Sequence, residues 1–179
     1  MKRAIFLERD GILNLAKVDR GTQVTPVTFA EFEINPVATT VCQHLKAAGF
    51  LLIATTNQPG LSTDTLSRRE LDRMHDQLRL ALPLDDILVC PHDAADHCPC
   101  RKPLPGLFTE AAFKFHIDLE RCFVISDKWH DARAARAVGA TSMIMQSPWV
   151  GSGHHDFVLP SLSVIADKIL QLQNRHLAA

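Results

Sequence analysis

Short apolar runs alternate along this chain with segments in which apolar residues recur at helical spacing. The runs span four to six residues and end abruptly in polar residues, which is typical of buried strands. We predict strands over 2–7, 50–54, 86–89, 122–125 and 142–145. The intervening periodic segments predict helices over 36–48, 67–82, 104–115, 132–138 and 162–172. Residues 14–35 show no clear period and are predicted to form a loop region with at most a short ordered piece.

The alternation of strands and helices predicts the fold class. Parallel strands need crossover connections, and helices in those connections cover both faces of the sheet. We therefore expect an α/β fold, a Rossmann-like three-layer sandwich around a central, mostly parallel sheet. The chain has 179 residues, of which 46% are hydrophobic, which suits a single domain over 1–179. The intervals between the polar strand ends leave no room for a large cap domain.

The net charge of −1 narrows the choice of partners. Without a basic field, neither nucleic acid nor an anionic membrane is expected, and an anion must be bound by a local site. Charges at Glu8, Arg9 and Asp10 interrupt the N-terminal run before a signal-peptide apolar region can develop. No run reaches membrane-spanning length. We expect a cytoplasmic protein, with a monomer as the default state.

Polar residues gather just after the predicted strands, and ligands bind at this edge of open parallel sheets. Strand ends in any soluble α/β domain carry polar turn formers, so each group alone is weak evidence. Together the groups supply acids, a hydroxyl, an amide and cations around one crevice. They are Glu8, Arg9 and Asp10; Thr56, Asn57 and Gln58; Arg101 and Lys102; and Ser126, Asp127, Lys128 and Asp131.

This set of side chains suits phosphoryl transfer, in which catalysis consists mainly of positioning and charge neutralisation. Oxygens of Glu8, Asp10 and Asp127 can hold a hard cation, and Mg²⁺ prefers such ligands together with phosphate oxygen and water. Lys102 can offset charge on the transferred phosphoryl group. Thr56 and the backbone amides beyond it can hold the remaining phosphate oxygens.

Four motifs resemble those of the haloacid dehalogenase (HAD) superfamily, and they occur in that superfamily's order. They are residues 6–11 (FLERDG), 54–60 (ATTNQPG), 100–103 (CRKP) and 124–131 (VISDKWHD). Each one falls at a predicted strand end or just before a helix, and the match spans residues 4 to about 146. Four such motifs in order would rarely arise by chance.

The resemblance implies a role for each matching residue. The first acid, Glu8, would attack phosphorus to form an acyl phosphate, and Asp10 would protonate the leaving oxygen and later activate water. The Glu8 side chain, the Asp10 carbonyl and Asp127 would ligate Mg²⁺. Thr56 and Lys102 would complete the catalytic group. Phosphate and substrate binding would fall to Thr56, Asn57, Gln58, Arg101, Lys102 and Lys128.

A cysteine-rich loop over 90–100 provides a second candidate site. Cys90, His92, Cys98 and Cys100 supply three thiolates and an imidazole, the ligand set of a closed, structural Zn²⁺ site. His97 or Asp93 can replace one of these ligands, and a loop of reduced cysteines without metal is the plainer alternative. The other two cysteines, Cys42 and Cys122, are expected to be packing residues.

The loop resembles the zinc loop of the heptose-bisphosphate phosphatases and the related histidinol phosphatases within that superfamily. This resemblance implies a small phosphorylated metabolite as substrate, with a heptose 1,7-bisphosphate first and histidinol phosphate second. The residues themselves do not choose between the two.

Glu8 departs from the superfamily pattern, which has aspartate at this position. The extra methylene moves the carboxylate by about 1.5 Å if the backbone stays in place, and a displacement near 1 Å can lower a rate about a hundredfold. Ile12 and Ser126 are milder departures. Three interpretations stay open: a phosphatase that uses Glu8 as nucleophile, a phosphosugar-binding or regulatory homologue with little or no activity, and an altered Glu8 in an ordinary enzyme.

Overall fold

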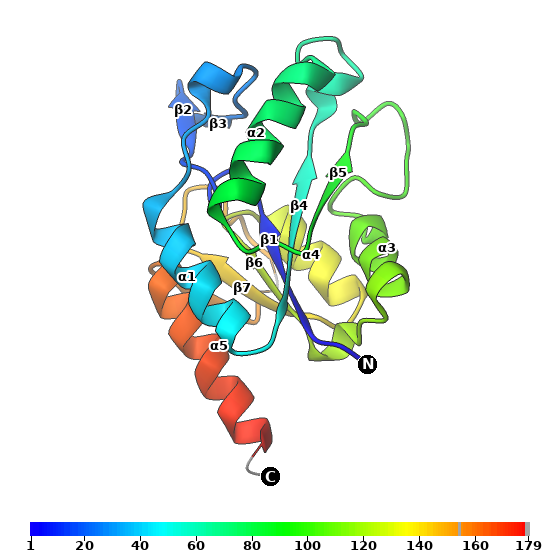
Figure 1. The fold of residues 1–179 in the computed structure, drawn as a ribbon. Helices are drawn as coiled ribbons and strands as arrows, with labels where there is room; N and C mark the ends of the chain where they lie inside the picture. Colours follow the sequence, from blue (N-terminus) through cyan, green and yellow to red (C-terminus); the bar gives the residue numbers. More distant parts are fainter. Residues whose placement is uncertain (154, 178–179) are drawn as a thin grey trace.

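The computed structural model of the chain describes residues 1–153 and 155–177, with five main helices around a six-stranded sheet (Figure 1). The strands lie in the order β5-β4-β1-β6-β7-β8, and every pairing between neighbours is parallel. The six strands are β1 (Ala4–Glu8), β4 (Leu51–Asn57), β5 (Asp86–Cys90), β6 (Phe123–Ser126), β7 (Thr141–Met145) and β8 (Phe157–Leu159). The predicted α/β fold with a parallel central sheet is confirmed.

Helices cover both faces of the sheet. Side chains alternate along β1, so that Ile5 and Leu7 join one apolar cluster while Ala4 and Phe6 join the other. The first cluster includes α1 (Pro36–Ala47), α2 (Arg68–Ala81) and α5 (Leu162–Leu177). The second cluster includes α3 (Gly106–Phe115) and α4 (Trp129–Ala137). The strand is therefore buried on both sides, as its uninterrupted apolar sequence predicts.

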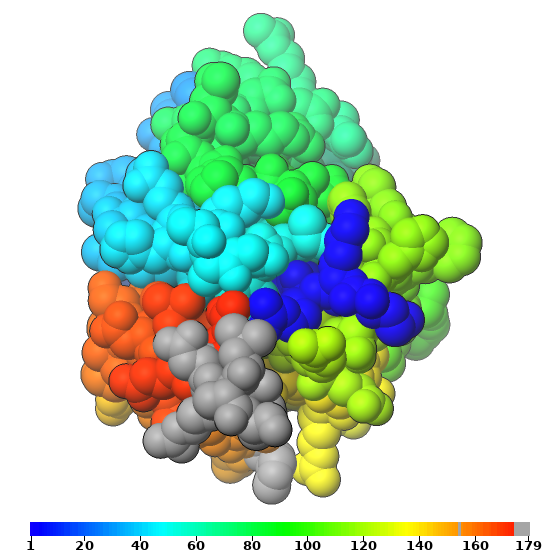
Figure 2. Space-filling view, turned by 60° about the horizontal axis from the view of Figure 1, so that its bottom comes forward, coloured from blue at the N-terminus to red at the C-terminus, as the bar shows by residue number. Residues whose placement is uncertain are grey.

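The N-terminal residues close the end of the molecule at which the strands begin. Figure 2 shows them, in blue, between the cyan of α1 and the yellow-green of α3 and the residues after it. The backbone N–H of Lys2 donates to the His116 carbonyl at 2.9 Å. None of the described helices combines the length and the apolar composition needed to cross a membrane. The opposite end, where the strands finish, remains available for a site.

Two elements differ from the prediction because their sequences lack a burial signal. Residues 14–35 form a hairpin of β2 (Lys17–Asp19) and β3 (Thr22–Val24), followed by the short helix η1 (Phe29–Glu31). Arg20 and Gly21 at its tip have φ of 47° and 79°, as a tight two-residue hairpin turn requires. Strand β8 lies at the sheet edge and is at most partly buried, so its sequence shows no apolar run.

Local capping fixes where α1 and α2 begin. The Asn35 side chain accepts the Val37 N–H before α1, and the Ser67 side chain accepts the Glu70 N–H before α2. The Glu70 carboxylate accepts the Phe29 N–H at 2.5 Å and so ties η1 to α2. This contact holds the segment after the hairpin against the body of the protein.

Helix α2 also buries a histidine against the loop that follows β1. His75 is 4% exposed, and its Nε2 lies 3.3 Å from Nη1 of Arg9, which is fully buried. Burial, and then the neighbouring Arg9 guanidinium, lower the pKa of His75 to about 3. The imidazole is therefore neutral in the folded protein at ordinary pH.

This burial predicts how stability depends on pH. Because the folded pKa lies below the unfolded value of 6.5, the contribution of His75 is present above pH 6.5 and is lost as pH falls toward 3. Relative to the His75→Gln variant, the wild-type protein should lose about 2 kcal/mol more between pH 7 and pH 5. Urea unfolding at several pH values measures this difference, and parallel curves for the two proteins would contradict it.

Candidate active site

A pocket of about 500 Å³ opens at the carboxyl ends of β1, β4 and β6, beside the cysteine loop. It brings together seven of the residues predicted to form the site: Glu8, Asp10, Asn57, Arg101, Lys102, Lys128 and Asp131. The other five predicted residues do not line it, because they are buried: Arg9, Thr56, Gln58, Ser126 and Asp127. The predicted residues therefore gather at one edge of the sheet, some on the pocket wall and the others buried.

Lys102 is the centre of the buried charge network. Its side chain is 2% exposed, and its ammonium donates to the carboxylates of Glu8 and Asp131, the latter at 2.6 Å, and to the Thr55 carbonyl at 3.2 Å. Although burial lowers the pKa of Lys102, attraction to Asp131 and Glu8 outweighs it and raises the pKa. Asp131 has its pKa raised to about 6 by burial, against the opposing effect of Lys102.

Glu8 stays ionised within this network. Burial raises the pKa of Glu8, but Lys102 and Lys128 together hold it well below its usual range. Its Oε2 accepts from Lys102, and its Oε1 accepts the backbone N–H groups of Arg9 at 3.1 Å and Asp10 at 3.4 Å. Both oxygens of the carboxylate at the nucleophile position therefore already have hydrogen-bond donors.

Asp10 is held from behind by two side chains. Arg9 donates to both carboxylate oxygens at 2.9 and 3.0 Å through Nη2, and Gln58 donates to Oδ2 at 3.0 Å. The same Gln58 amide donates to Oγ1 of Thr56 at 2.7 Å. Gln58 thus faces Asp10 rather than the pocket, and it links the ends of β1 and β4.

Asn57 fixes the backbone that carries Lys102. Its amide donates to the Lys102 carbonyl at 3.0 Å, and its Oδ1 accepts the Lys102 N–H at 3.1 Å. This paired contact joins the last residue of β4 to the segment after the cysteine loop. Asn57 therefore lines the pocket and also positions the central lysine.

The Asp10 carbonyl and the Asp127 carboxylate converge on one point, as a cation site requires. Nζ of Lys128 lies 2.5 Å from the carbonyl oxygen and 2.7 Å from Asp127 Oδ1. The Gln23 amide of β3 donates to the same carbonyl at 3.2 Å and to Asp127 Oδ2 at 3.4 Å. A Cβ at Gly11 would lie 2.3 Å from Asp127 Oδ2, so only glycine allows this approach.

These two oxygens fit Mg²⁺ in chemistry, because hard oxygen donors are its preferred ligands. The Glu8 carboxylate, the third predicted ligand, instead binds Lys102 and two backbone amides. Lys128 therefore supplies the positive charge at the point where the predicted ligands converge. Attraction to Glu8 and Asp127 raises the pKa of Lys128 despite its burial, so the ammonium stays charged.

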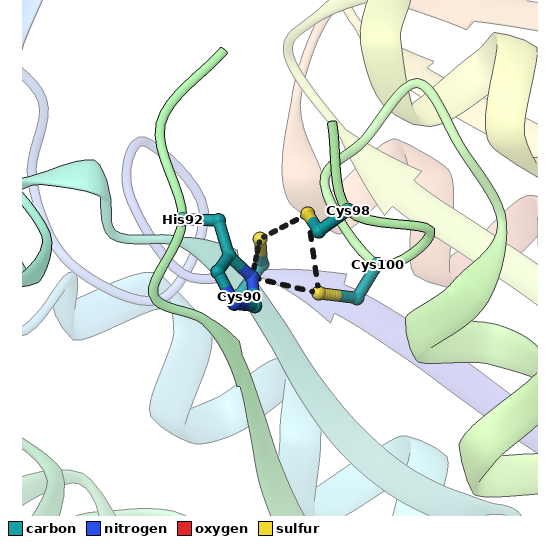
Figure 3. A group of neighbouring side chains, drawn as sticks. All are labelled: Cys90, His92, Cys98 and Cys100. Atoms are coloured by element: carbon teal, nitrogen blue, oxygen red, sulfur yellow. Dashed lines mark hydrogen bonds between the residues drawn. The ribbon is translucent and has the colours of Figure 1, made fainter. Parts of the chain in front are cut away.

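The four predicted zinc ligands converge (Figure 3). Cys90 Sγ lies 3.6 Å from both His92 Nδ1 and Cys98 Sγ, and Cys100 Sγ lies 3.3 Å from His92 Nδ1 and 3.5 Å from Cys98 Sγ. A tetrahedron with Zn–S bonds of about 2.3 Å has sulfur–sulfur edges of about 3.8 Å, so the arrangement fits zinc closely. Asp93 and His97 are not members of the group and line the pocket instead.

The cysteine loop also forms one wall of the pocket. Arg101, next to Cys100, donates from Nη1 to the His92 carbonyl at 2.9 Å. Arg101, which was predicted to contact substrate, therefore lines the pocket and is also hydrogen-bonded to the cysteine loop. The four clustered side chains hold the segment from which Arg101 and Lys102 project.

From the sequence, residues 14–27 and the cysteine loop are expected to shape the pocket, and both segments line it, but several of the individual lining residues were not predicted. Gln23 and Thr25 come from the hairpin, and Trp129 and His130 from the start of α4, which begins three residues earlier than predicted. The Trp129 and His130 rings stack with centroids 3.8 Å apart. Trp129 and His130 lie within the fourth motif, directly after Asp127 and Lys128, whereas no pattern marked Gln23 or Thr25 within their segment.

The fold and this edge of the sheet define the class of protein, a HAD-like hydrolase. The family model described as HAD-hydrolase-like matches residues 99–161. Among solved structures, D,D-heptose 1,7-bisphosphate phosphatase from Bordetella bronchiseptica, complexed with magnesium and phosphate, has a TM-score of 0.82 at 27% identity and covers 96% of this chain and 99% of that one. The corresponding phosphatase from Burkholderia thailandensis, at 20% identity and a TM-score of 0.67, covers 95% and 99% and shows the same fold.

Sequence relatives identify the branch. D-glycero-β-D-manno-heptose-1,7-bisphosphate 7-phosphatase from Helicobacter pylori J99 is 34% identical over 138 residues, which cover 74% of this chain and 76% of the relative. The relative of the same name from Pasteurella multocida is 31% identical, with coverage of 81% and 82%. The chain therefore belongs to the heptose-bisphosphate phosphatase family of HAD-like phosphatases, and the resemblance seen in its motifs is confirmed.

The geometry of the cysteine cluster predicts one tightly held zinc ion per chain. Protein purified without chelator should contain zinc by elemental analysis, and Cys98→Ser should lose most of it because one of four ligands is gone. Cys42→Ala, at a buried cysteine outside the cluster, should keep the wild-type content. Zinc-free wild-type protein, or full zinc in Cys98→Ser, would contradict the assignment.

The bridging position of Lys128 predicts an effect on magnesium affinity. Lys128→Met should bind Mg²⁺ about tenfold or more tightly, because the ammonium no longer competes for the Asp10 carbonyl and Asp127. Calorimetric titration measures this directly. Lys114→Met, an exposed lysine on α3, serves as the matched control and should leave the affinity unchanged. Weaker binding by Lys128→Met would reverse the interpretation.

Proposed function

We propose that this protein is a Mg²⁺-dependent phosphomonoester hydrolase that acts on a small phosphorylated sugar through an acyl-phosphate intermediate on Glu8. The observation that carries the proposal is the convergence of Glu8, Asp10, Asn57 and Lys102 in one pocket. Membership of the phosphatase family supports it. Lys102 and Lys128 hold the pKa of Glu8 well below its usual range against the opposing effect of burial, so its carboxylate is anionic, as a nucleophile must be.

In the first step, a Glu8 oxygen attacks phosphorus and the bond from phosphorus to the leaving oxygen breaks. Asp10 gives its proton to that oxygen, so the product leaves as an alcohol. Lys102, already bonded to Glu8, offsets negative charge as the new bond forms. Asn57 keeps Lys102 in place through the paired backbone contact.

In the second step, water attacks the phosphorus of the glutamyl phosphate. Asp10, now ionised, takes a proton from that water, and the bond between phosphorus and the Glu8 oxygen breaks. Phosphate leaves and both carboxyl groups return to their starting states. Asp10 thus acts as acid and then as base, which is why the support from Arg9 and Gln58 matters.

Mg²⁺, when bound, would neutralise the phosphate oxygens and help to orient them. The Asp10 carbonyl and Asp127 would hold it, with Glu8 as the third ligand once its carboxylate turns from its present donors. Lys128 would then be free to contact substrate. Zn²⁺ would be held by Cys90, His92, Cys98 and Cys100 in a closed site that has no position for substrate.

We assign a heptose 1,7-bisphosphate as the first candidate substrate, following the relatives of that name, and histidinol phosphate as the second. Arg101 lines the pocket beside the cysteine loop, and its guanidinium suits a second anionic group on the substrate. The cytoplasm is the proposed compartment, since disulfides are rare there and none of the five cysteines is in a disulfide.

One observation favours a second candidate function, a phosphosugar-binding protein with little turnover. Both carboxylate oxygens of Glu8 already accept hydrogen bonds from protein donors. The residue as a whole is only 5% exposed. Attack on phosphorus would have to compete with these bonds. Phosphate could still be bound by the cations and amides of the pocket.

Phosphate release with Mg²⁺ separates the two candidates. Wild-type protein, Glu8→Asp and Asp10→Asn are assayed with heptose 1,7-bisphosphate and histidinol phosphate. We expect turnover by the wild-type protein, an increase of about a hundredfold in Glu8→Asp because the nucleophile is realigned, and a loss of about 10²–10⁴-fold in Asp10→Asn.

The outcomes differ sharply between the two functions. Turnover that disappears in Asp10→Asn supports the glutamate-nucleophile phosphatase and identifies its substrate. If only Glu8→Asp turns over, the scaffold is intact and the natural chain binds rather than hydrolyses. If neither turns over while both bind phosphate, the hydrolase assignment is wrong.

A further inference from the structure

Arg9, between the two acids of the first motif, is a fully buried arginine. A guanidinium cannot lose its charge in a protein, so its burial requires acceptors on every side that carries a donor. Its Nε and Nη2 donate to Asp10, and its Cζ lies 5.6 Å from the centre of the Phe32 ring. One side of the guanidinium, at Nη1, is left for a residue from another element.

His75 of α2 supplies that remaining acceptor. Its Nε2 lies 3.3 Å from Arg9 Nη1 and is itself buried. The neutral ring has one nitrogen that accepts and one that donates, and facing a guanidinium requires Nε2 to be the acceptor. A protonated ring would place two positive charges side by side, so only the neutral imidazole fits.

The contacts form a chain from the helix to the pocket. His75 orients Arg9, and Arg9 in turn holds both oxygens of Asp10, with distances of 2.9 and 3.0 Å from Nη2. Asp10 is the only member of the chain that lines the pocket. The forked geometry of a guanidinium fixes the plane of a carboxylate, which a single donor cannot do.

We propose that His75 is a positioning residue for Asp10, acting through Arg9. The inference rests on the proposed function, in which Asp10 protonates the leaving oxygen. Without an acceptor at position 75, Arg9 would turn to find another partner and the Asp10 carboxylate would rotate with it. A misplaced acid weakens the first chemical step most when the leaving oxygen needs its proton.

The dependence on the leaving group tests this role. We compare kcat/KM for wild type, His75→Leu and His75→Gln on two substrates. One is the sugar phosphate that the phosphate-release assay identifies, which is an alkyl phosphate, and the other is p-nitrophenyl phosphate. The nitrophenolate leaves without protonation, whereas the sugar alkoxide does not. His75→Leu should lose at least about tenfold more on the sugar phosphate than on p-nitrophenyl phosphate.

Two matched variants separate positioning from general damage. His75→Gln keeps an acceptor oxygen at similar reach and should recover most of the sugar-phosphate rate. Met74→Leu, a volume-conserving change at the neighbouring buried residue, should leave both substrates within about twofold of wild type. Circular dichroism checks that each variant is folded. If His75→Leu does not fold, the comparison of the two substrates is made with His75→Gln, which should then stay close to wild type on both.

The outcomes distinguish this inference from the proposed function. If the natural chain does not turn over, the comparison is made in the Glu8→Asp background. Equal losses by His75→Leu on both substrates, or no recovery in His75→Gln, would overturn the positioning role while the phosphatase function stands. Absence of turnover in both backgrounds would remove the function and the positioning role together.

Discussion

The pairing of one buried ammonium holds this site together. Lys102 is almost inaccessible to solvent, and an unpaired charge there would be strongly destabilising. Glu8 from the end of β1 and Asp131 from α4 supply the partners, while Asn57 at the end of β4 fixes the backbone of Lys102. Because these residues come from different elements, the pairing can form only when the sheet, α4 and the cysteine loop are all in place.

The cysteine cluster and the pocket are therefore structurally connected. Cys100 immediately precedes Arg101 and Lys102, and Arg101 is bonded back to His92. A loop without its own hydrophobic core needs another source of order, and four converging ligands can supply it through a metal ion. Arg101 and Lys102 directly follow the loop, so order in the loop also fixes the position of these two cations at the pocket.

The hydrogen-bond donors around Glu8 determine the charge and the position of its carboxylate. Its longer side chain reaches Lys102 and two backbone amides at once, and this set of donors keeps it ionised. The same donors restrain it from leaving its position. Meanwhile Lys128 and Gln23 satisfy the Asp10 carbonyl and Asp127. The site is thus internally neutralised, and a phosphorylated ligand has to exchange these contacts for its own.

The sequence alone determined the parallel α/β fold, and it predicted the edge that carries the pocket and the grouping of Cys90, His92, Cys98 and Cys100, because buried strands and closely spaced ligands leave local patterns. It did not reveal the hairpin of β2 and β3 or edge strand β8, whose residues are at least partly exposed and show no apolar period. Only the tertiary structure decided that Thr56 and Gln58 lie behind the pocket, that Lys128 bridges Asp10 and Asp127, and that His75 supports Arg9. These contacts join residues far apart in the chain, and the direction of a side chain at a strand end depends on which partners the fold brings within reach.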